Sequence, residues 1–247
     1  MKKIKVAIAG CLGRMGQELT RKVSNHKQIN FVGGFDVKND KNFINKIFKK
    51  ADIVIDFSST NAIKNNLKLA LLHKTSLVIG TTGLNQKEYS LLKNASKKIP
   101  ILYSSNMSLG VNLLFSLVQQ VASILDKSDY DIEISETHHK HKKDAPSGTA
   151  LSLGQYAAKG RKTNFEKVKV LDRTQKSSVR KKGNIGFSVT RGGEIAGEHN
   201  VSFIGANDRI DLYHKANNRS IFVEGAIKAV IFLSKKEKGF FNMKDLF

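Results

Sequence analysis

One short run of the sequence carries most of the side chains that could do acid–base chemistry. It is Glu136-Thr137-His138-His139-Lys140-His141-Lys142-Lys143-Asp144-Ala145-Pro146-Ser147-Gly148-Thr149. Histidine takes up and releases a proton near neutral pH, and a lysine ammonium pairs with anionic groups. An apolar-periodic stretch follows, so Ser147 or Thr149 is placed to cap a helix whose backbone a ligand can approach at Gly148. A helix N-terminus beside lysines and histidines predicts a carboxylate-binding site with an acid or base attached.

Two other interpretations of this run are a metal site and a solvated basic surface. Three histidines in four positions suggest metal ligation. The neighbouring lysines would repel a dication, however, and no suitably spaced set of carboxylates and histidines completes a coordination shell. We therefore expect no metal. The helix start that follows Pro146 argues against a plain basic surface.

A second candidate site is the glycine loop Gly10-Cys11-Leu12-Gly13-Arg14-Met15-Gly16, between an expected strand and an expected helix. Glycines at this position permit a tight turn and let the helix N-terminus present its N–H groups to a pyrophosphate. The spacing departs from a strict G-x-G-x-x-G, because Leu12 occupies the middle position. Taken alone, the loop fits an ordinary strand-to-helix turn equally well.

An acidic residue favours the nucleotide interpretation of that loop. Asp36 ends the second expected strand, about 20 residues after the loop, where a carboxylate can accept hydrogen bonds from an adenosine ribose. It would repel the 2′-phosphate of NADPH, whereas Lys38 could compensate, so the choice between NADH and NADPH stays open. Further polar turns, Gly80-Thr81-Thr82 and Ser104-Ser105-Asn106-Met107, follow later strands at the edge where open α/β sheets bind ligands.

The elements that must position these residues follow two patterns. Up to about residue 108, short apolar runs alternate with amphipathic stretches, which predicts an α/β fold with a Rossmann-like, doubly wound parallel sheet. We expect strands at 4–9, 29–35, 53–57, 76–79 and 101–104, and helices at 14–25, 42–49, 62–73 and 86–98.

The second pattern predicts a smaller α+β domain with a mixed or antiparallel sheet. Its expected helices are 111–125 and 149–159, and its expected strands are 130–136, 185–190, 197–204 and 209–214. Turns at 192–193 and 207–208 fit antiparallel connections. A basic, polar linker spans 160–182, and a last helix at 220–234 could return to the first domain. We therefore expect a dinucleotide-binding domain at 1–108 and 217–247 and a substrate-binding domain at 109–216.

Composition limits the classes of partner. The 247 residues carry a formal charge of +21, but lysines are scattered and only eight of the 42 basic residues are arginine. We expect no specific nucleic-acid partner, although the field would help to collect a small anionic substrate. No apolar run approaches the roughly 20 residues of a membrane-spanning helix. The single cysteine, Cys11, rules out an internal disulfide, and no secretory leader is recognisable, so we expect a cytoplasmic protein.

The run from His138 to Ala150 resembles the signature of the 4-hydroxy-tetrahydrodipicolinate reductase family, formerly called dihydrodipicolinate reductase. Other segments occur in that family's order along essentially the whole chain, at 7–16, 56–58, 80–83, 106–112, 191–199 and 214–219. The resemblance implies reduction of a cyclic unsaturated dicarboxylate by NADPH or NADH, in the diaminopimelate route to lysine. It also implies a homotetramer formed through the sheet of the second domain.

The resemblance implies roles for individual residues. His138 falls on the general acid/base and Lys142 on a second proton donor. Substrate contacts fall on His139, Gly148 and Thr149, to which the spacing adds Ser147. Cofactor contacts, with Lys38 added by its position, are Gly10, Cys11, Leu12, Gly13, Arg14, Met15, Asp36, Lys38, Gly80, Thr81, Thr82, Ser104, Ser105, Asn106 and Met107.

Two departures and one alternative remain. The Ser104-Ser105 pair stands where alanine or proline is more usual in the family, a change that we expect to be tolerated because the contacts there are largely made by backbone. Val37 stands where many relatives have an arginine, so a preference for NADPH does not follow from the resemblance. A module that senses nicotinamide nucleotides on the same fold, without catalysis, is the alternative function. The intact histidine and lysine run argues against it.

Overall fold

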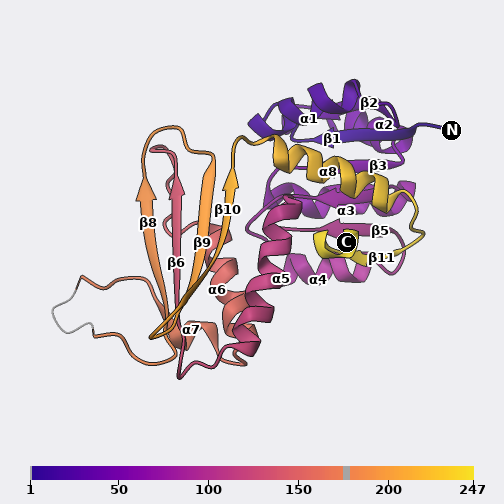
Figure 1. Ribbon diagram of the computed structural model, residues 1–247. Coiled ribbons are helices and arrows are strands. Elements are labelled where there is room, and N and C mark those ends of the chain that lie inside the picture. Colours follow the sequence, from indigo (N-terminus) through magenta and orange to yellow (C-terminus); the bar gives the residue numbers. More distant parts are fainter. Residues whose placement is uncertain (1, 175–178) are drawn as a thin grey trace. The chain divides into compact units, whose positions relative to one another are not determined.

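Two units make up the chain in the computed structural model, which describes residues 2–174 and 179–247 (Figure 1). The first unit comprises the residues up to 109 together with 220–247, and the second comprises 110–219. Sequence analysis placed the two boundaries at 108/109 and 216/217. Each unit has its own sheet and its own core.

The first unit is built on a six-stranded sheet in the order β11-β5-β4-β3-β1-β2, and every neighbouring pair is parallel. This confirms the predicted Rossmann-like α/β fold. Its strands are β1 (Ile4–Ala9), β2 (Ile29–Phe35), β3 (Ile53–Asp56), β4 (Ser76–Ile79), β5 (Pro100–Tyr103) and β11 (Gly239–Phe241). Its helices are α1 (Arg14–Ser24), α2 (Lys41–Lys50), α3 (Thr60–His73), α4 (Gln86–Ala95), α8 (Ser220–Leu233) and the 3-10 helix η1 (Met243–Leu246).

Successive side chains of each strand point to opposite faces of the sheet, so this unit has a hydrophobic core on each face. In β1, Val6 and Ile8 pack with α1 and α8, whereas Ala7 and Ala9 pack with α2, α3 and α4. All four side chains are fully buried. A parallel sheet that is covered on both faces needs such continuous apolar strands. The helix expected at 220–234 therefore completes one face of the first unit, next to α1 (Figure 1).

The second unit is built on a five-stranded mixed sheet in the order β10-β9-β6-β8-β7. Its strands are β6 (Asp131–His138), β7 (Lys169–Val170), β8 (Ile185–Arg191), β9 (Gly197–Ile204) and β10 (Arg209–Ala216). Central β6 pairs parallel with β8 and antiparallel with β9. Helices α5 (Leu109–Ile124) and α6 (Gly148–Gly160) pack on its apolar face through a core that includes Val118, Ile134 and Leu153.

Three features of the second unit and the C-terminal end differ from the sequence expectations. The expected linker at 160–182 contains α7 (Phe165–Val168) and β7, which joins the sheet beside β8, and residues 175–178 of it lie outside the described residues. The turn at 207–208 does join the antiparallel neighbours β9 and β10. The turn at 192–193 does not make a hairpin, because β6 lies between β8 and β9. Strand β11 was not predicted, since three residues are too few for a periodic signal.

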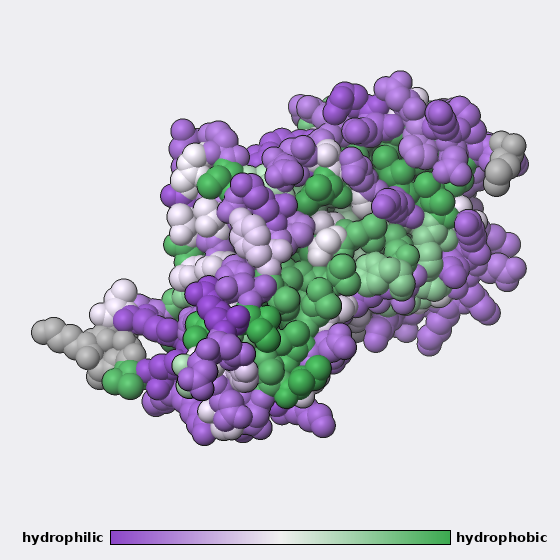
Figure 2. Space-filling view, viewed as in Figure 1, coloured by the Kyte–Doolittle hydropathy of each residue, from purple (hydrophilic) through white to green (hydrophobic). Residues whose placement is uncertain are grey.

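Hydrophilic side chains cover the region of α1 and α2 in the space-filling view (Figure 2). On these helices the charged residues lie on the solvent face, while Leu19, Val23, Ile47 and Phe48 are buried. Among the described residues, none of the helices combines the length and apolarity that crossing a membrane requires.

Helix α8 approaches the turn after β5 so closely that only glycine fits at the contact. A Cβ atom added to Gly225 would lie 1.7 Å from the carbonyl oxygen of Met107. Backbone cannot retract as a flexible side chain can, so any larger residue must displace the helix or the turn.

We expect Gly225→Ala to lower the free energy of unfolding by about 1–3 kcal/mol, because the overpacking outweighs the better helix propensity of alanine. Lys228→Ala, an exposed change on the same helix, is the control and should stay within about 0.5 kcal/mol of wild type. Urea unfolding of the three proteins measures the difference. A Gly225→Ala protein as stable as wild type would show that the contact relaxes without cost.

Candidate active site

The carboxyl ends of β1, β3, β4 and β5 meet at one edge of the parallel sheet, and backbone hydrogen bonds join the loops that follow them. The amide of Phe57 donates to the carbonyl of Ala9 (3.1 Å), and the amide of Gly80 donates to that of Asp56 (2.9 Å). The amide of Ser104 donates to the carbonyl of Ile79 (3.2 Å). The predicted segments 10–16, 80–82 and 104–107 are therefore brought to one edge, where open α/β sheets bind ligands.

The glycine loop leaves the start of α1 open. Gly13 occupies the N-cap position and no side chain caps the helix. A Cβ atom at Gly16 would lie 2.0 Å from the carbonyl oxygen of Gly10, so the first turn sits tightly on the loop. Backbone N–H groups and the positive end of the helix dipole are thus available to an anion. The loop fits a pyrophosphate in spite of Leu12 at its middle position.

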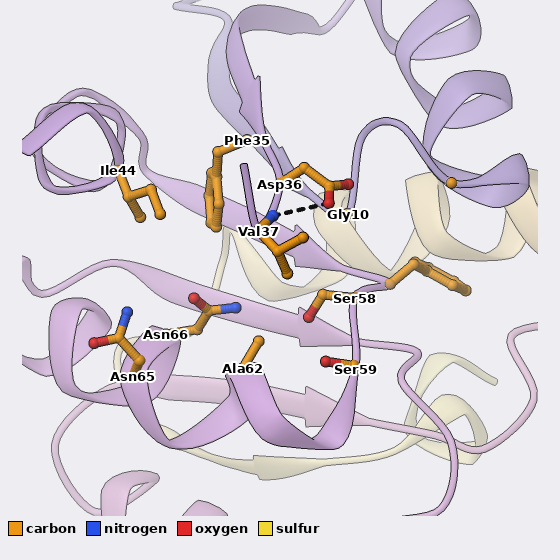
Figure 3. A pocket seen from close by; sticks show the side chains of 12 residues that line it. Gly10, Phe35, Asp36, Val37, Ile44, Ser58, Ser59, Ala62, Asn65 and Asn66 are labelled. Atoms are coloured by element: carbon orange, nitrogen blue, oxygen red, sulfur yellow. Dashed lines mark hydrogen bonds between the residues drawn. The ribbon is translucent and has the colours of Figure 1, made fainter. Parts of the chain in front are cut away.

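A pocket of about 380 Å³ lies between the ends of β1, β2 and β3 and the start of α3 (Figure 3). Its lining residues are Gly10, Gly13, Phe35, Asp36, Val37, Ile44, Phe57, Ser58, Ser59, Ala62, Asn65 and Asn66. Phe35 and Ile44 make an apolar wall, and the two asparagines present amides from α3. The pocket is thus suited to a flat, partly polar ring beside a group with hydroxyls.

Asp36 fixes the polar corner of this pocket. Its carboxylate accepts hydrogen bonds from the amide of Val37 (2.8 Å) and from the amide of Leu12 in the glycine loop (3.3 Å). The next residue, Val37, is 82% exposed and carries no charge. A carboxylate at this position can still accept hydrogen bonds from a ribose.

The other predicted residues of this edge differ in how much of them a ligand can reach. Met107 is only 2% exposed and its side chain belongs to the core. Thr81 and Ser104 are also buried. Burial and the nearby carboxylate of Asp36 raise the pKa of the Cys11 thiol. Exposed side chains are those of Leu12, Arg14, Lys38, Thr82 and Ser105, whereas Met15 and Asn106 are partly buried.

Sequence reasoning did not single out Asp56 as a site residue, although it holds this edge together. Its carboxylate is fully buried at the end of β3 and accepts hydrogen bonds from Ser58 (amide 2.9 Å, hydroxyl 2.5 Å) and from the amide of Asn66 (2.8 Å). It also accepts from the hydroxyl of Thr81 (3.1 Å). The polar residue that ends the apolar run at 53–55 was the available signal.

The second cluster of functional side chains lies in the other unit, at the end of β6. Ile132, Ile134, Glu136 and His138 are all buried, because they occupy alternate positions on the face that packs against the helices. The last two are polar, and burying them requires partners. Sheet register supplies these: His199 of β9 lies opposite Glu136, and Arg191 of β8 lies opposite His138.

Glu136 is the centre of this cluster. Nδ1 of His138 makes a short hydrogen bond to its Oε2, and Arg191 binds both oxygens (Nη1–Oε2 3.0 Å, Nη2–Oε1 2.8 Å). The amide of Ser147 donates to Oε1 (3.0 Å). Burial alone would raise the pKa of the carboxyl, but the hydrogen bonds from His138, Arg191 and Ser147 lower it to about 2. Glu136 is therefore ionised at neutral pH.

His199 stays neutral beside it. Burial, and then repulsion from His138, lower its pKa to about 3. Its Nε2 lies 3.1 Å from the hydroxyl of Ser147. That hydroxyl also accepts from the amide of Ala150 (3.2 Å), so Ser147 is the N-cap of α6, one of the two candidates that the sequence offered. The start of α6 is thus tied directly to β9.

The loop between β6 and α6 carries the remaining predicted residues. Lys142 pairs with Asp144 (2.8 Å), and the Lys142 side chain is 21% exposed. Nη2 of Arg219 lies 3.4 Å from Nε2 of His139. Burial and Arg219 lower the pKa of His139, and within the described residues its buried Nδ1 has no hydrogen-bond partner. Gly148 is exposed and Thr149 is partly buried in the first turn of α6.

The geometry places one potential metal-ligand set here, and it differs from the three histidines that the sequence suggested. Glu136, His138 and His199 bring ligand atoms within 4.8 Å of one another. Arg191 already binds both carboxylate oxygens, and its positive charge would repel a dication. Nδ1 of His138 is engaged as well. The donor set is built for proton chemistry and does not fit a metal ion.

Each unit therefore gathers one predicted group of residues. Glu136 belongs to the run that the sequence singled out, but no site role was predicted for it or for Arg191, His199 and Arg219. Glu136 carried a local signal, because an acidic residue interrupts an apolar alternation that leads directly to His138. Arg191 and His199 come from distant strands, and only the sheet register brings them close, whereas Arg219 lies in the turn that follows β10.

Family comparisons agree along the whole chain. Family models described as "Dihydrodipicolinate reductase, N-terminus" and "Dihydrodipicolinate reductase, C-terminus" match residues 4–107 and 110–247. The 4-hydroxy-tetrahydrodipicolinate reductase of Zymomonas mobilis is 43% identical, with 98% of this chain and 96% of the relative covered. The enzyme of the same name from Buchnera aphidicola subsp. Cinara cedri is 40% identical, with 99% and 97% covered.

A solved structure has the same fold. It is described as dipicolinate-bound dihydrodipicolinate reductase from Paenisporosarcina sp. TG-14, and it matches with a TM-score of 0.74 at 23% identity. The match covers 97% of each chain.

The neutral state of His199 predicts a pH dependence of stability. The unfolded chain binds a proton at this residue near its ordinary pKa of about 6.5, whereas the folded chain binds it only near 3, so stability falls as the pH drops through this window. We expect His199→Gln to make the free energy of unfolding less dependent on pH between about 6 and 4, by up to about 1.4 kcal/mol per pH unit. Urea unfolding at each pH measures both slopes. Equal slopes would show that His199 binds its proton equally well in both states.

Proposed function

Because the chain belongs to the dihydrodipicolinate reductase family, we propose that it reduces 4-hydroxy-tetrahydrodipicolinate to tetrahydrodipicolinate with NADPH or NADH, a step of lysine and diaminopimelate biosynthesis. One hydride and one proton are added to the substrate, and its hydroxyl group leaves as water. The observation that carries the proposal is the cluster at the end of β6, where a buried histidine held by a carboxylate lies beside the N-terminus of α6.

The first unit supplies the nucleotide site. The open start of α1 would bind the pyrophosphate, and Asp36 at the corner of the pocket would bind the adenosine ribose. A bound reduced nicotinamide supplies the hydride. The turns at 80–82 and 104–107 complete this edge, chiefly through their backbone.

The second unit supplies the groups for a dicarboxylate. The Lys142 ammonium, Nδ1 of His139 and the N–H groups of Gly148 and Thr149 are suited to carboxylate oxygens. Ser147 supports the same helix start as its N-cap. The Paenisporosarcina relative is described as dipicolinate-bound, and dipicolinate is a cyclic dicarboxylate. Lys142 would exchange Asp144 for a substrate carboxylate when substrate binds.

His138 supplies the proton. Hydride transfer leaves negative charge on the substrate, which a nearby cation stabilises and a positioned acid neutralises. Repulsion from His138 and from Lys142 lowers the pKa of His199, so both residues lie near His199. His138 is the general acid of the proposal and Lys142 the second proton donor.

The remaining parts of the proposal follow the family resemblance. The protein works in the cytoplasm as a homotetramer that needs no metal, nucleic acid or membrane. Asp36 beside the uncharged Val37 accommodates a ribose hydroxyl, and Lys38 offers a charge for a 2′-phosphate, so both cofactors enter the proposal.

Absorbance of the reduced nicotinamide tests the function directly. Pyruvate and aspartate semialdehyde are condensed in place to make the substrate, and NADH and NADPH are compared in parallel. Oxidation that depends on the condensation product is expected, and the ratio of the two rates reports on Asp36, Val37 and Lys38. Folded protein that binds nucleotide without oxidising either cofactor would instead favour the non-catalytic sensing module.

We expect His138→Gln to lower kcat by about 10²–10⁴-fold, the usual contribution of a general acid, and to leave nucleotide affinity unchanged. Stopped assays and cofactor fluorescence titration measure the two quantities. His141→Gln is the matched control, because the His141 side chain lies in the same loop and is 68% exposed. Parallel loss of turnover and nucleotide binding would mark His138 as a structural residue.

A further inference from the structure

A carboxylate that has no role of its own in the proposed chemical step binds one side of the His138 imidazole. Glu136 lies two residues earlier on β6, on the same buried face, and its Oε2 accepts the hydrogen bond from Nδ1. Because the carboxylate is ionised, the neutral imidazole must carry its proton on Nδ1. Nε2 is then the nitrogen that gains and loses a proton.

The orientation of the Glu136 carboxylate is fixed by its other hydrogen bonds. Arg191 binds both of its oxygens and the amide of Ser147 binds Oε1, so four hydrogen bonds fix the carboxylate. Arg191 also donates to the carbonyl of Asp144 (2.6 Å), which ties the loop of Lys142 to the same group. A carboxylate with this many donors is a rigid anchor and a poor proton acceptor.

Gly197 leaves the space that the ring occupies on its other side. A Cβ atom at Gly197 would lie 2.8 Å from Nε2 of His138, and this residue has φ of +151°. Only glycine combines that conformation with that clearance. Within the described residues, no hydrogen bond reaches Nε2, and the His138 side chain is 10% exposed.

Several charged or titratable groups face His138. Glu136 is on its own strand, Arg191 comes from β8 and His199 from β9, where its ring lies 5.1 Å from that of His138. Lys142 and His139 come from the loop that follows β6. Among these groups, Glu136 alone is an anion.

We propose that Glu136 is the positioning residue of the proton donor: held by Arg191 and Ser147, it fixes the orientation and the Nδ1–H form of His138, so that Nε2 delivers the proton. This rests on the proposed function, in which His138 is the general acid. Glu136 touches neither substrate nor cofactor in this scheme and acts through His138 alone. The arrangement follows the general logic of carboxylate–histidine pairs in acid–base catalysis.

Two substitutions have opposite expected effects on the pH profile. An enzyme that needs a protonated histidine loses activity on the alkaline side. Glu136→Gln removes the negative charge beside Nδ1 of His138, so the alkaline limb of kcat/KM should move to lower pH. Arg191→Gln removes the positive charge from the same carboxylate, so the limb should move to higher pH. A role in folding alone would move neither limb.

Comparing kcat with KM distinguishes a residue that positions His138 from one that binds the substrate. We expect Glu136→Gln to lower kcat by about 10²-fold or more, with KM for the dicarboxylate within about threefold of wild type, since the substrate contacts are intact. Glu133→Gln is the matched control. Glu133 lies on β6 and pairs with Arg173 (2.5 Å) and with Arg180, but it does not contact His138. This control should keep the wild-type rate and pH profile.

A measurement on the wild-type enzyme keeps the test independent of whether a variant folds. Nitrogen NMR of histidine-labelled protein reports which ring nitrogen bears the proton, and the His138→Gln spectrum identifies the signal. The expected result is a neutral His138 protonated on Nδ1. A neutral His138 protonated on Nε2 would overturn the proposal.

The outcomes also distinguish this inference from the proposed function. If His138→Gln abolishes turnover but Glu136→Gln keeps the wild-type rate and pH profile, the positioning role is wrong and the reductase assignment stands. If wild type does not oxidise reduced nicotinamide with substrate, the proposed function fails whatever the tautomer of His138.

Discussion

A buried carboxylate is the constraint on which the second unit is built. Leaving Glu136 charged and unpaired on the apolar face of β6 would cost several kcal/mol. Donors from three separate segments bind the carboxylate: His138, two residues later on β6, Arg191 at the end of β8, and the amide of Ser147 at the start of α6. The requirement to satisfy one anion therefore brings together the histidine, the arginine and the helix N-terminus that the proposed chemistry needs.

The first unit uses the same device for another purpose. Asp56 is fully buried at the end of β3, and its donors come from the loops after β3 and β4 and from α3. In both units an acidic residue ends an apolar strand and fixes the loops around it. In the first unit the loop after β3 and the start of α3 border the pocket of about 380 Å³, and in the second the donors to the carboxylate include a histidine.

Local sequence signals predicted a large part of this arrangement. The doubly wound pattern, the glycine loop and the capped start of α6 are encoded within short windows, and the structure contains all three. The pairing of Glu136 with Arg191 is not encoded in this way, since 55 residues separate them and only the parallel register of β6 and β8 makes them neighbours. For the same reason, the turn at 192–193 suggested a hairpin that the intervening strand β6 prevents.

Because the second sheet contains parallel and antiparallel pairs, its two ends differ in how well they tolerate changes of loop length and sequence. Because β9 runs antiparallel to β6, its first residues lie at the same end of the sheet as the last residues of β6 and β8, and the side chains of Glu136, His138, Arg191 and His199 all lie at that end. The opposite end holds the start of β6 and the turn at 205–208 between β9 and β10, more than a strand's length from His138. Loops there can lengthen or shorten during evolution without altering the pairing of Glu136 with His199 or of His138 with Arg191. That end of the sheet is also the natural place to attach a label, a tag or an inserted domain.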